Sequence, residues 1–129
     1  MSRSGYIDDC ENVWLWRQAV ARATNGARGQ SLLRRLRDAL DAMPTKRLIK
    51  NEVQSETGDV CALGALDPKA PFEEYEPEII AGHFGIAYSL AAEIMYMNDE
   101  WPHARETPEE RWTRMRAWVD EQIQSAPNA

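Results

Sequence analysis

The feature that most restricts the fold is a glycine, Gly85, in the middle of the most apolar stretch of the chain. This stretch runs from Ile79 to Glu100 and reads IIAGHFGIAYSLAAEIMYMNDE. Three apolar residues before the glycine predict a short helix: Ile79, Ile80 and Phe84. After it, apolar residues recur at the spacing of one helix face: Ile86, Leu90, Ile94 and Met97. Because glycine accepts the left-handed conformation that ends many helices, we expect two helices joined by a tight turn in a small core.

The same spacing predicts two helices near the N-terminus. Asp8 and Glu11 have the separation of a helix N-cap and its partner, and Asn25-Gly26 is a common helix end. The second helix extends from about Gln30 to Met43 and ends at Pro44. We expect the two helices to form an antiparallel hairpin. Two i,i+4 ion pairs are predicted on the outside of the second helix: Arg34 with Asp38, and Arg37 with Asp41.

A specific start signal marks the last helix. Thr107-Pro108-Glu109-Glu110 combines a capping box with a proline at the first helical position. The apolar residues that follow at helical spacing predict its inner face: Trp112, Met115, Val119 and Ile123.

Two structures remain open for the segment from Arg47 to Leu66. It fits a two-stranded hairpin that turns at Gly58, and it fits a helix that begins after Asp59 as the N-cap. The helix is slightly favoured, because Cys61 to Leu66 contains no β-branched residue. The next segment, Asp67 to Glu78, has three prolines and four glutamates and predicts an irregular surface loop.

A length of 129 residues suffices for a single domain, residues 1–129, with its own core. No apolar run approaches about 18 residues, so no transmembrane helix is expected. The N-terminal MSRSGYIDDC lacks the apolar segment of a signal peptide, which predicts a cytoplasmic protein with Cys10 and Cys61 as free thiols. The expected fold is mainly α: a compact bundle of four or five helices, with at most one small β-hairpin near Gly58.

The charge is divided unevenly along the chain, although the net charge is only −6. Residues 1–50 contain ten Lys and Arg against five Asp and Glu, whereas residues 51–129 contain five against sixteen. Such a division predicts a dipolar surface whose acidic side meets a basic partner. The residues expected to form this partner-binding surface come from the acidic loop and the neighbouring aromatic positions: Glu73, Glu74, Tyr75, Glu76, Glu78, Asp99, Glu100 and Trp101. Trp14 and Trp118 are further candidates for an exposed aromatic patch, because tryptophan often anchors interfaces.

Nucleic acid is the alternative partner, and two regions of the chain have features of a nucleic-acid-binding surface. A basic face would use the following residues: Arg28, Arg34, Arg35, Arg37, Arg47 and Lys50. The element spanning residues 79–97 resembles a helix-turn-helix whose second helix would present Tyr88, Ser89, Ala92 and Glu93. None of these four is basic, so DNA phosphates would be repelled from this helix.

No pattern predicts catalysis, a metal or a cofactor. The chain lacks a glycine-rich phosphate loop, a nucleophile elbow and a cysteine–histidine pairing. His83 and His103 have no further ligands at metal-binding spacing, and Asn98-Asp99-Glu100 lacks the remaining ligands of a calcium loop. We therefore expect a protein that is not an enzyme and that binds neither cofactor nor membrane.

Five segments resemble a group of small bacteriophage and prophage proteins. They are MSRSGYIDDCE, GQSLLRRLRDALDAMPTKRLI, GDVCALGAL, FGIAYSLAAEIMYMNDE and TPEERWTRMRAWV, which together span nearly the whole chain. The segment between VCALGAL and the central helix is shorter here than in those proteins. The resemblance implies a phage product acting in the bacterial cytoplasm, and it supplies no reaction or catalytic residues. The expected function is an inhibitor, similar in kind to an anti-CRISPR protein, that binds a host nucleic-acid-handling or defence complex. A virion assembly protein is a further alternative.

Overall fold

The computed structural model describes residues 13–69, 75–100 and 105–125, and over these residues the chain is mainly helical, as predicted. The described helices are α1 (Val13–Asn25), α2 (Ala27–Ala42), α3 (Ala62–Leu66), α4 (Pro77–Phe84), α5 (Tyr88–Asp99) and α6 (Pro108–Ser125). The structure describes six helices where four or five were expected, and the two short helices predicted before Leu66 and before Gly85 are both among them, as α3 and α4.

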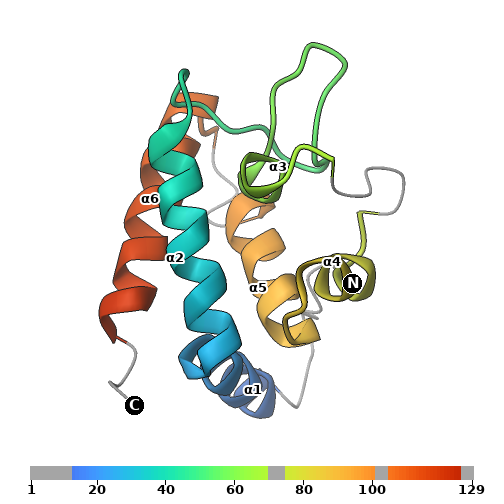
Figure 1. Cartoon of the computed structure of the whole chain (residues 1–129), viewed down its shortest axis with the longest axis vertical. Coiled ribbons are helices and arrows are strands. Elements are labelled where there is room, and N and C mark those ends of the chain that lie inside the picture. Colours follow the sequence, from blue (N-terminus) through green and yellow to red (C-terminus); the bar gives the residue numbers. More distant parts are fainter. Residues whose placement is uncertain (1–12, 70–74, 101–104, 126–129) are drawn as a thin grey trace.

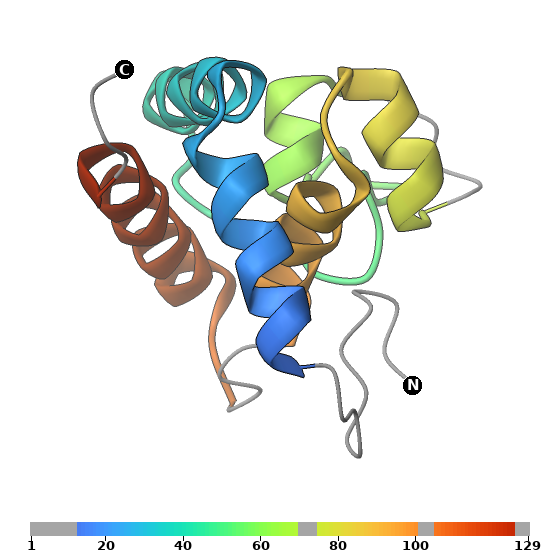
Figure 2. The same cartoon turned by 90° about the horizontal axis from the view of Figure 1, so that it is seen from below.

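The core lies between α2, α5 and α6, and α1, α3 and α4 close it on the remaining sides (Figures 1 and 2). Leu33, Leu36 and Leu40 of α2 are fully buried, as is Ile94 of α5. Met115 and Val119 of α6 are fully buried too, which confirms the inner face predicted for the last helix. Each such side chain removed from water stabilises the fold by about 1.5–3 kcal/mol before conformational entropy is counted.

The predicted antiparallel hairpin of α1 and α2 is wrong. A single residue, Gly26, separates the two helices, and α1 lies across the ends of α2 and α5 (Figures 1 and 2). The backbones of α1 and α2 come close together at Gly29, in the first turn of α2. A side chain does not fit there, since a Cβ atom on Gly29 would lie 2.0 Å from the carbonyl oxygen of Ala23. The apolar pattern predicted both helices but gave no information on their crossing.

The two predicted i,i+4 ion pairs of α2 are also absent among the described contacts. Arg37 Nε donates to Asp38 at 3.2 Å, and Asp41 instead accepts two hydrogen bonds from Arg116 of α6, at 2.7 and 3.1 Å. The Arg116 guanidinium lowers the pKa of the Asp41 carboxyl below its ordinary value. Because α6 lies beside α2, a bidentate contact between helices replaces the pair within one helix.

The segment from Arg47 to Leu66 contains elements of both predicted structures. Gly58, with φ of +90°, makes a tight turn, and a single antiparallel bridge joins Gln54 to Val60. The favoured helix is present as α3, but its N-cap is Cys61 and not Asp59. Gly64 allows α3 to pack closely on this turn, because a Cβ atom there would meet the Val53 carbonyl oxygen at 2.2 Å.

The tight turn at Gly85 is confirmed. Gly85 adopts φ of +69° and ends α4, and the axes of α4 and α5 are bent by 115° relative to each other.

No single described helix is both long and apolar enough to cross a membrane, although the bent pair of α4 and α5 meets the criteria of length and composition when taken together.

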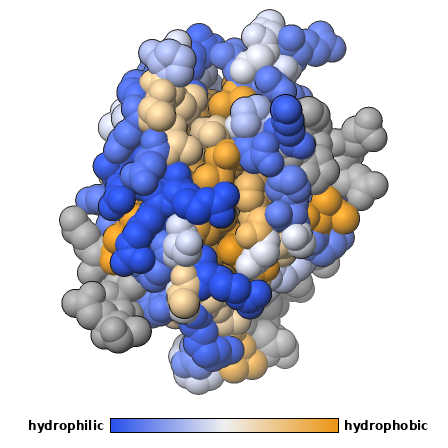
Figure 3. Space-filling model, in the orientation of Figure 1, coloured by the Kyte–Doolittle hydropathy of each residue, from blue (hydrophilic) through white to orange (hydrophobic). Residues whose placement is uncertain are grey.

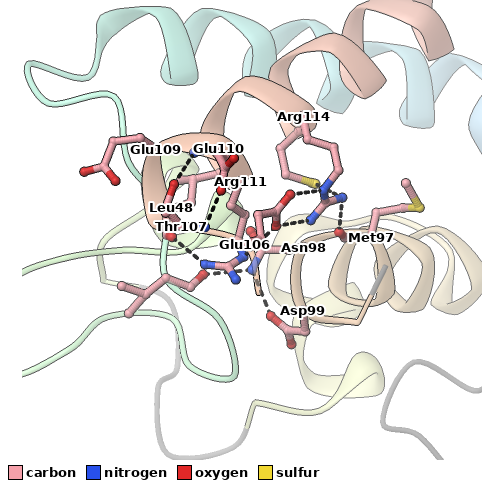
Figure 4. A network of polar contacts seen from close by, with 12 residues as sticks. Leu48, Met97, Asn98, Asp99, Glu106, Thr107, Glu109, Glu110, Arg111 and Arg114 are labelled. Atoms are coloured by element: carbon pink, nitrogen blue, oxygen red, sulfur yellow. Dashed lines mark hydrogen bonds and ion pairs between the residues drawn. The ribbon is translucent and has the colours of Figure 1, made fainter. Parts of the chain in front are cut away.

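The predicted capping box of α6 is confirmed (Figure 4). Glu110 N–H donates to Thr107 Oγ1 at 3.1 Å, and Thr107 N–H donates back to the Glu110 carboxylate at 2.8 Å. The start of α6 is also joined to a distant segment, since Leu48 N–H donates to Pro108 O at 3.0 Å and buried Arg111 donates to Leu48 O at 3.0 Å. These contacts fix the position of residues 47–49 against α6.

Candidate interaction surface

The polar residues at the end of α5 hold the fold together and are not a free acidic surface. Asn98 is buried: its Oδ1 accepts the N–H of Ala62 at 3.1 Å, and its Nδ2 donates to the Ile49 carbonyl at 2.9 Å. Asp99 Oδ1 accepts Asn98 Nδ2 at 2.8 Å and Asn51 N–H at 3.0 Å (Figure 4). Asn98 therefore caps α3, and Asp99, predicted for partner binding, instead orders the loop before α3.

Glu106 forms a second polar centre beside this one (Figure 4). Its carboxylate accepts Arg114 Nε at 2.6 Å and Arg114 Nη2 at 2.9 Å, and it lies 3.4 Å from Arg111 Nε. Arg114 also donates to the carbonyl of Met97 at 2.6 Å. Glu106 is thus paired with two arginines, and all three side chains are largely buried, as expected of a structural network and not of a binding site.

Tyr75 was predicted to lie on the partner-binding surface, and this is wrong. Only 6% of it is exposed, and it packs in the core beside Cys61 and Asp99. Burial, followed by these two neighbours, raises the pKa of its hydroxyl well above the ordinary value. Three other predicted residues of that surface, Glu73, Glu74 and Trp101, lie outside the described residues.

Two predicted acidic residues lie beside an exposed aromatic residue. Glu76 and Glu78, at the start of α4, are both exposed. Tyr88, the first residue of α5, is 43% exposed, and partial burial, followed by Glu78 and Glu76, raises the pKa of its hydroxyl. The Tyr88 ring meets the ring of Trp16 edge-on, with centroids 6.0 Å apart. Elements that start far apart in the sequence thus bring acidic and aromatic groups together. Glu100, the remaining predicted residue, is half-buried at the other end of α5.

The large exposed apolar side chains come from the first turn of α1, next to Trp16, and from Tyr88, whose ring contacts that of Trp16. Among the described residues they are Val13, Trp14, Leu15 and Tyr88, with Trp14 the most exposed at 67%. We call these four residues, with Trp16, Glu76 and Glu78, the aromatic–acidic surface. Trp14 was a sequence candidate for an exposed patch, whereas Trp118, the other described candidate, packs half-buried against the core.

The helix-turn-helix-like element presents only part of the expected set: Tyr88 is exposed, whereas Ala92 and Glu93 are not. Its bend is compatible with that motif, but Ala92 is fully buried and Glu93 is only 4% exposed. Helix α1 covers this side of α5: Arg17 Nη1 donates to Glu93 at 2.9 Å, and Ser89 Oγ donates to the Ala19 carbonyl at 3.3 Å. Entry of α5 into a DNA groove would require α1 to move away.

The predicted basic face is dispersed. Arg28 and Arg35 line one hollow beside α2, whereas Arg37 pairs with Asp38. Arg34 is exposed on α2. Arg47 and Lys50 follow the C-terminal end of α2 in the chain; Arg47 pairs with Asp59 at 3.5 Å, and Lys50 is exposed. Counted at 1.5 Å per residue, Arg28 is about 20 Å from the end of α2. This arrangement does not form the continuous positive track that binds a nucleic-acid backbone.

The described residues contain no constellation typical of catalysis. Cys61 is fully buried, and burial raises the pKa of its thiol to about 12, so it is not a nucleophile at neutral pH. His83 Nε2 lies 2.7 Å from Asp67 Oδ2, and this contact lowers the pKa of the Asp67 carboxyl. The pair joins α4 to the end of α3. In the part of the chain that the structure describes, no three His, Cys, Asp or Glu side chains are placed to bind a metal.

Comparisons with protein families, with curated proteins and with solved structures find no match to this chain. The candidate surface therefore rests on its own chemistry. The sequence analysis did not identify Tyr88 and Trp16 as residues of the candidate surface. For Tyr88 a signal was available, because this large aromatic residue does not continue the apolar face of its helix; Trp16 lies on the apolar face of α1 with Val20, so nothing in the sequence marked it.

Proposed function

We propose that the protein is a non-enzymatic interaction protein that binds a partner protein through the aromatic–acidic surface. The observation that carries this proposal is that exposed Tyr88 lies beside Glu76 and Glu78 and contacts Trp16, which directly follows the exposed residues Val13, Trp14 and Leu15 at the start of α1. Monomeric proteins rarely expose large aromatic residues together without a use, and tryptophan and tyrosine are enriched at binding hot spots. The acidic residues beside them favour a partner with a basic surface.

A protein partner is favoured over nucleic acid by the sign of the charge. The aromatic residues lie next to carboxylates, and carboxylates repel the phosphates that provide most of the affinity for DNA and RNA. A basic protein surface, such as one that itself binds nucleic acid, offers the complementary charge. Covering such a surface would block its normal ligand.

The resemblance to small bacteriophage and prophage proteins suggests the biological setting. In that setting the partner is a host nucleic-acid-handling or defence complex, and the protein acts in the bacterial cytoplasm as its inhibitor. The binding surface proposed here does not depend on that setting, since it follows from the exposed side chains alone.

The test is a pull-down from nuclease-treated bacterial lysate with the tagged protein, followed by mass spectrometry. We expect one host protein in stoichiometric amount, lost in the double variant Trp14→Ala/Tyr88→Ala and in Glu76→Lys/Glu78→Lys. The charge control is Glu52→Lys/Glu56→Lys, which makes the same change in net charge at two other exposed positions. Equal recovery with all variants would exclude this surface, and recovery of nucleic acid alone from untreated lysate would favour a nucleic-acid-binding protein.

A further inference from the structure

A second surface, formed by one side of α2, carries basic residues, in contrast to the acidic residues of the aromatic–acidic surface. Two hollows lie in line along this helix, one of about 410 Å³ and one of about 260 Å³. Among the α2 residues that line them, five recur every three or four positions along one side of the helix: Arg28, Leu32, Arg35, Ala39 and Ala42. Figure 3 shows apolar atoms gathered in this hollowed face, between α2 and the pair α3 and α4.

The opposite wall of each hollow comes from a different helix. Gly64 and Ala65 of α3 line the larger hollow, and Phe84 and Gly85, at the end of α4, line the smaller one. Small residues keep the larger hollow open, because Ala39, Ala42 and Ala65 have no side chain long enough to fill it. We call the two hollows together the α2 groove.

The charges along the α2 groove are mainly positive, although the protein carries a net charge of −6. The charged residues that line it are three arginines and one aspartate: Arg28, Arg35, Arg47 and Asp59. Asp59 is partly neutralised by Arg47 at 3.5 Å. Asp67, next to Pro68 on the rim of the larger hollow, is paired with His83. An occupant of this groove therefore meets apolar walls and, at the Arg28 end, two arginines that form no ion pair with any described residue.

We propose that the α2 groove binds an acidic amphipathic helix of a partner protein. An amphipathic helix places an apolar side chain every three or four residues, which matches the two hollows in line, and its carboxylates reach Arg28 and Arg35 at the groove margin. The 16 residues of α2 correspond to about 24 Å, so a partner helix of about four turns fills the groove. This site uses none of the residues of the aromatic–acidic surface, so the two proposals succeed or fail independently.

The probe for this proposal is a displayed library of random 16-residue peptides, selected on the immobilised full-length protein. We expect enrichment of peptides with Glu or Asp flanking Leu, Ile or Phe at positions i, i+4 and i+7. Binding of the enriched peptides is then measured by fluorescence anisotropy. Arg28→Glu/Arg35→Glu should weaken binding by about tenfold or more, as expected when close charge pairs at an interface become repulsive. Ala42→Trp, which fills the larger hollow from an exposed position, should weaken it to a similar extent.

Matched controls separate the groove from general effects of charge and bulk. Arg34→Glu/Arg105→Glu makes the same change in net charge at two exposed residues that line neither hollow, and Ala21→Trp adds the same bulk to the exposed side of α1. Both should bind the peptides as the unmodified protein does, and circular dichroism melting should show that all variants are folded. The proposal is overturned if no acidic peptide is enriched or if the groove variants bind like their controls. It is also overturned if a 20-nucleotide RNA binds this face through the same arginines and the peptides do not.

Discussion

Single residues at the end of α5 determine how the loop before α3 is held. Asn98 receives the first N–H of α3 and donates to the Ile49 carbonyl, so one side chain satisfies two backbone groups from different segments. Asn51 has φ of +70°, a conformation that asparagine tolerates better than most residues, and its N–H is directed to Asp99. The acidic residues that follow Asn98, namely Asp99 and Glu100, predicted partner binding. The hydrogen bonds of Asn98 and Asp99 show instead that these two side chains stabilise the fold.

Replacing Asn98 should therefore be costly. Asn98→Ala leaves the Ala62 N–H and the Ile49 carbonyl without this partner, and we expect the free energy of unfolding to fall by about 3 kcal/mol in urea denaturation. Asn51→Gly is the control, because glycine keeps both the positive φ and the N–H donor; its effect should stay below about 1 kcal/mol. A small loss for Asn98→Ala would mean that water replaces the amide at little cost.

Cys61 should behave as a buried, inert thiol. Burial raises its pKa to about 12, so the thiolate is nearly absent at pH 8 in the folded protein. In a Cys10→Ser variant, which leaves only this thiol, we expect no reaction with Ellman's reagent until denaturant unfolds the chain. Rapid reaction of one thiol equivalent in buffer would show that the core around α3 opens readily.

At the scale of helices, the close contact between α1 and α2 depends on the missing side chain at position 29. Gly29→Ala would place a Cβ atom 2.0 Å from Ala23 O, so α1 must shift, and we expect destabilisation of about 1–3 kcal/mol. Gly82→Ala is the matched control: nothing lies within 4 Å of its added Cβ atom, and alanine there should raise stability by up to about 1 kcal/mol. Thermal melting of the pair checks this, and equal melting temperatures would mean that α1 is not held against α2 as described.

The start of α6 offers a second test at this scale. Thr107→Ala removes the hydroxyl cap and should cost about 1 kcal/mol, whereas Thr107→Ser should restore most of the loss. The hydrogen bonds from Thr107 also lower the pKa of Glu110, so its stabilising contribution is complete near neutral pH and is lost as the pH falls through that lowered pKa. Urea denaturation at pH 7 measures the cap, and a serine variant as unstable as the alanine variant would contradict it.

Local signals in the sequence predicted the helices well and their packing poorly. Thr107-Pro108 and Gly85 specify helix ends through contacts within a few residues, and the structure agrees with both. The contact of Asp41 with Arg116, the burial of Glu93 and the burial of Tyr75 depend on which helices meet, and no local pattern contains that information. The candidate surface was predicted in part for the same reason: Glu76 and Glu78 were identified, but their neighbours Tyr88 and Trp16 come from other helices.

At the scale of the whole molecule, the division of charge along the sequence becomes two separate surfaces. The residues of the aromatic–acidic surface come from the starts of α1, α4 and α5, and the α2 groove with its arginines lies between α2 and the pair α3 and α4 (Figure 3). Basic residues dominate the first 50 positions of the chain, and two of them, Arg17 and Arg47, pair with carboxylates from later segments. Arg28 and Arg35, which form no ion pair with a described residue, line the α2 groove beside apolar walls, which favours a protein partner there.

The most direct test of the central claim is photo-crosslinking from the aromatic–acidic surface in living bacterial cells. Benzoylphenylalanine at position 14 replaces one exposed aromatic residue by another, and at position 113, on an exposed site of α6, it serves as the control. Binding through this surface predicts one crosslinked host protein from position 14, abolished by Glu76→Lys/Glu78→Lys, and none from position 113. The absence of a product at position 14, or the same products from both positions, would contradict the proposal that this surface binds a specific partner.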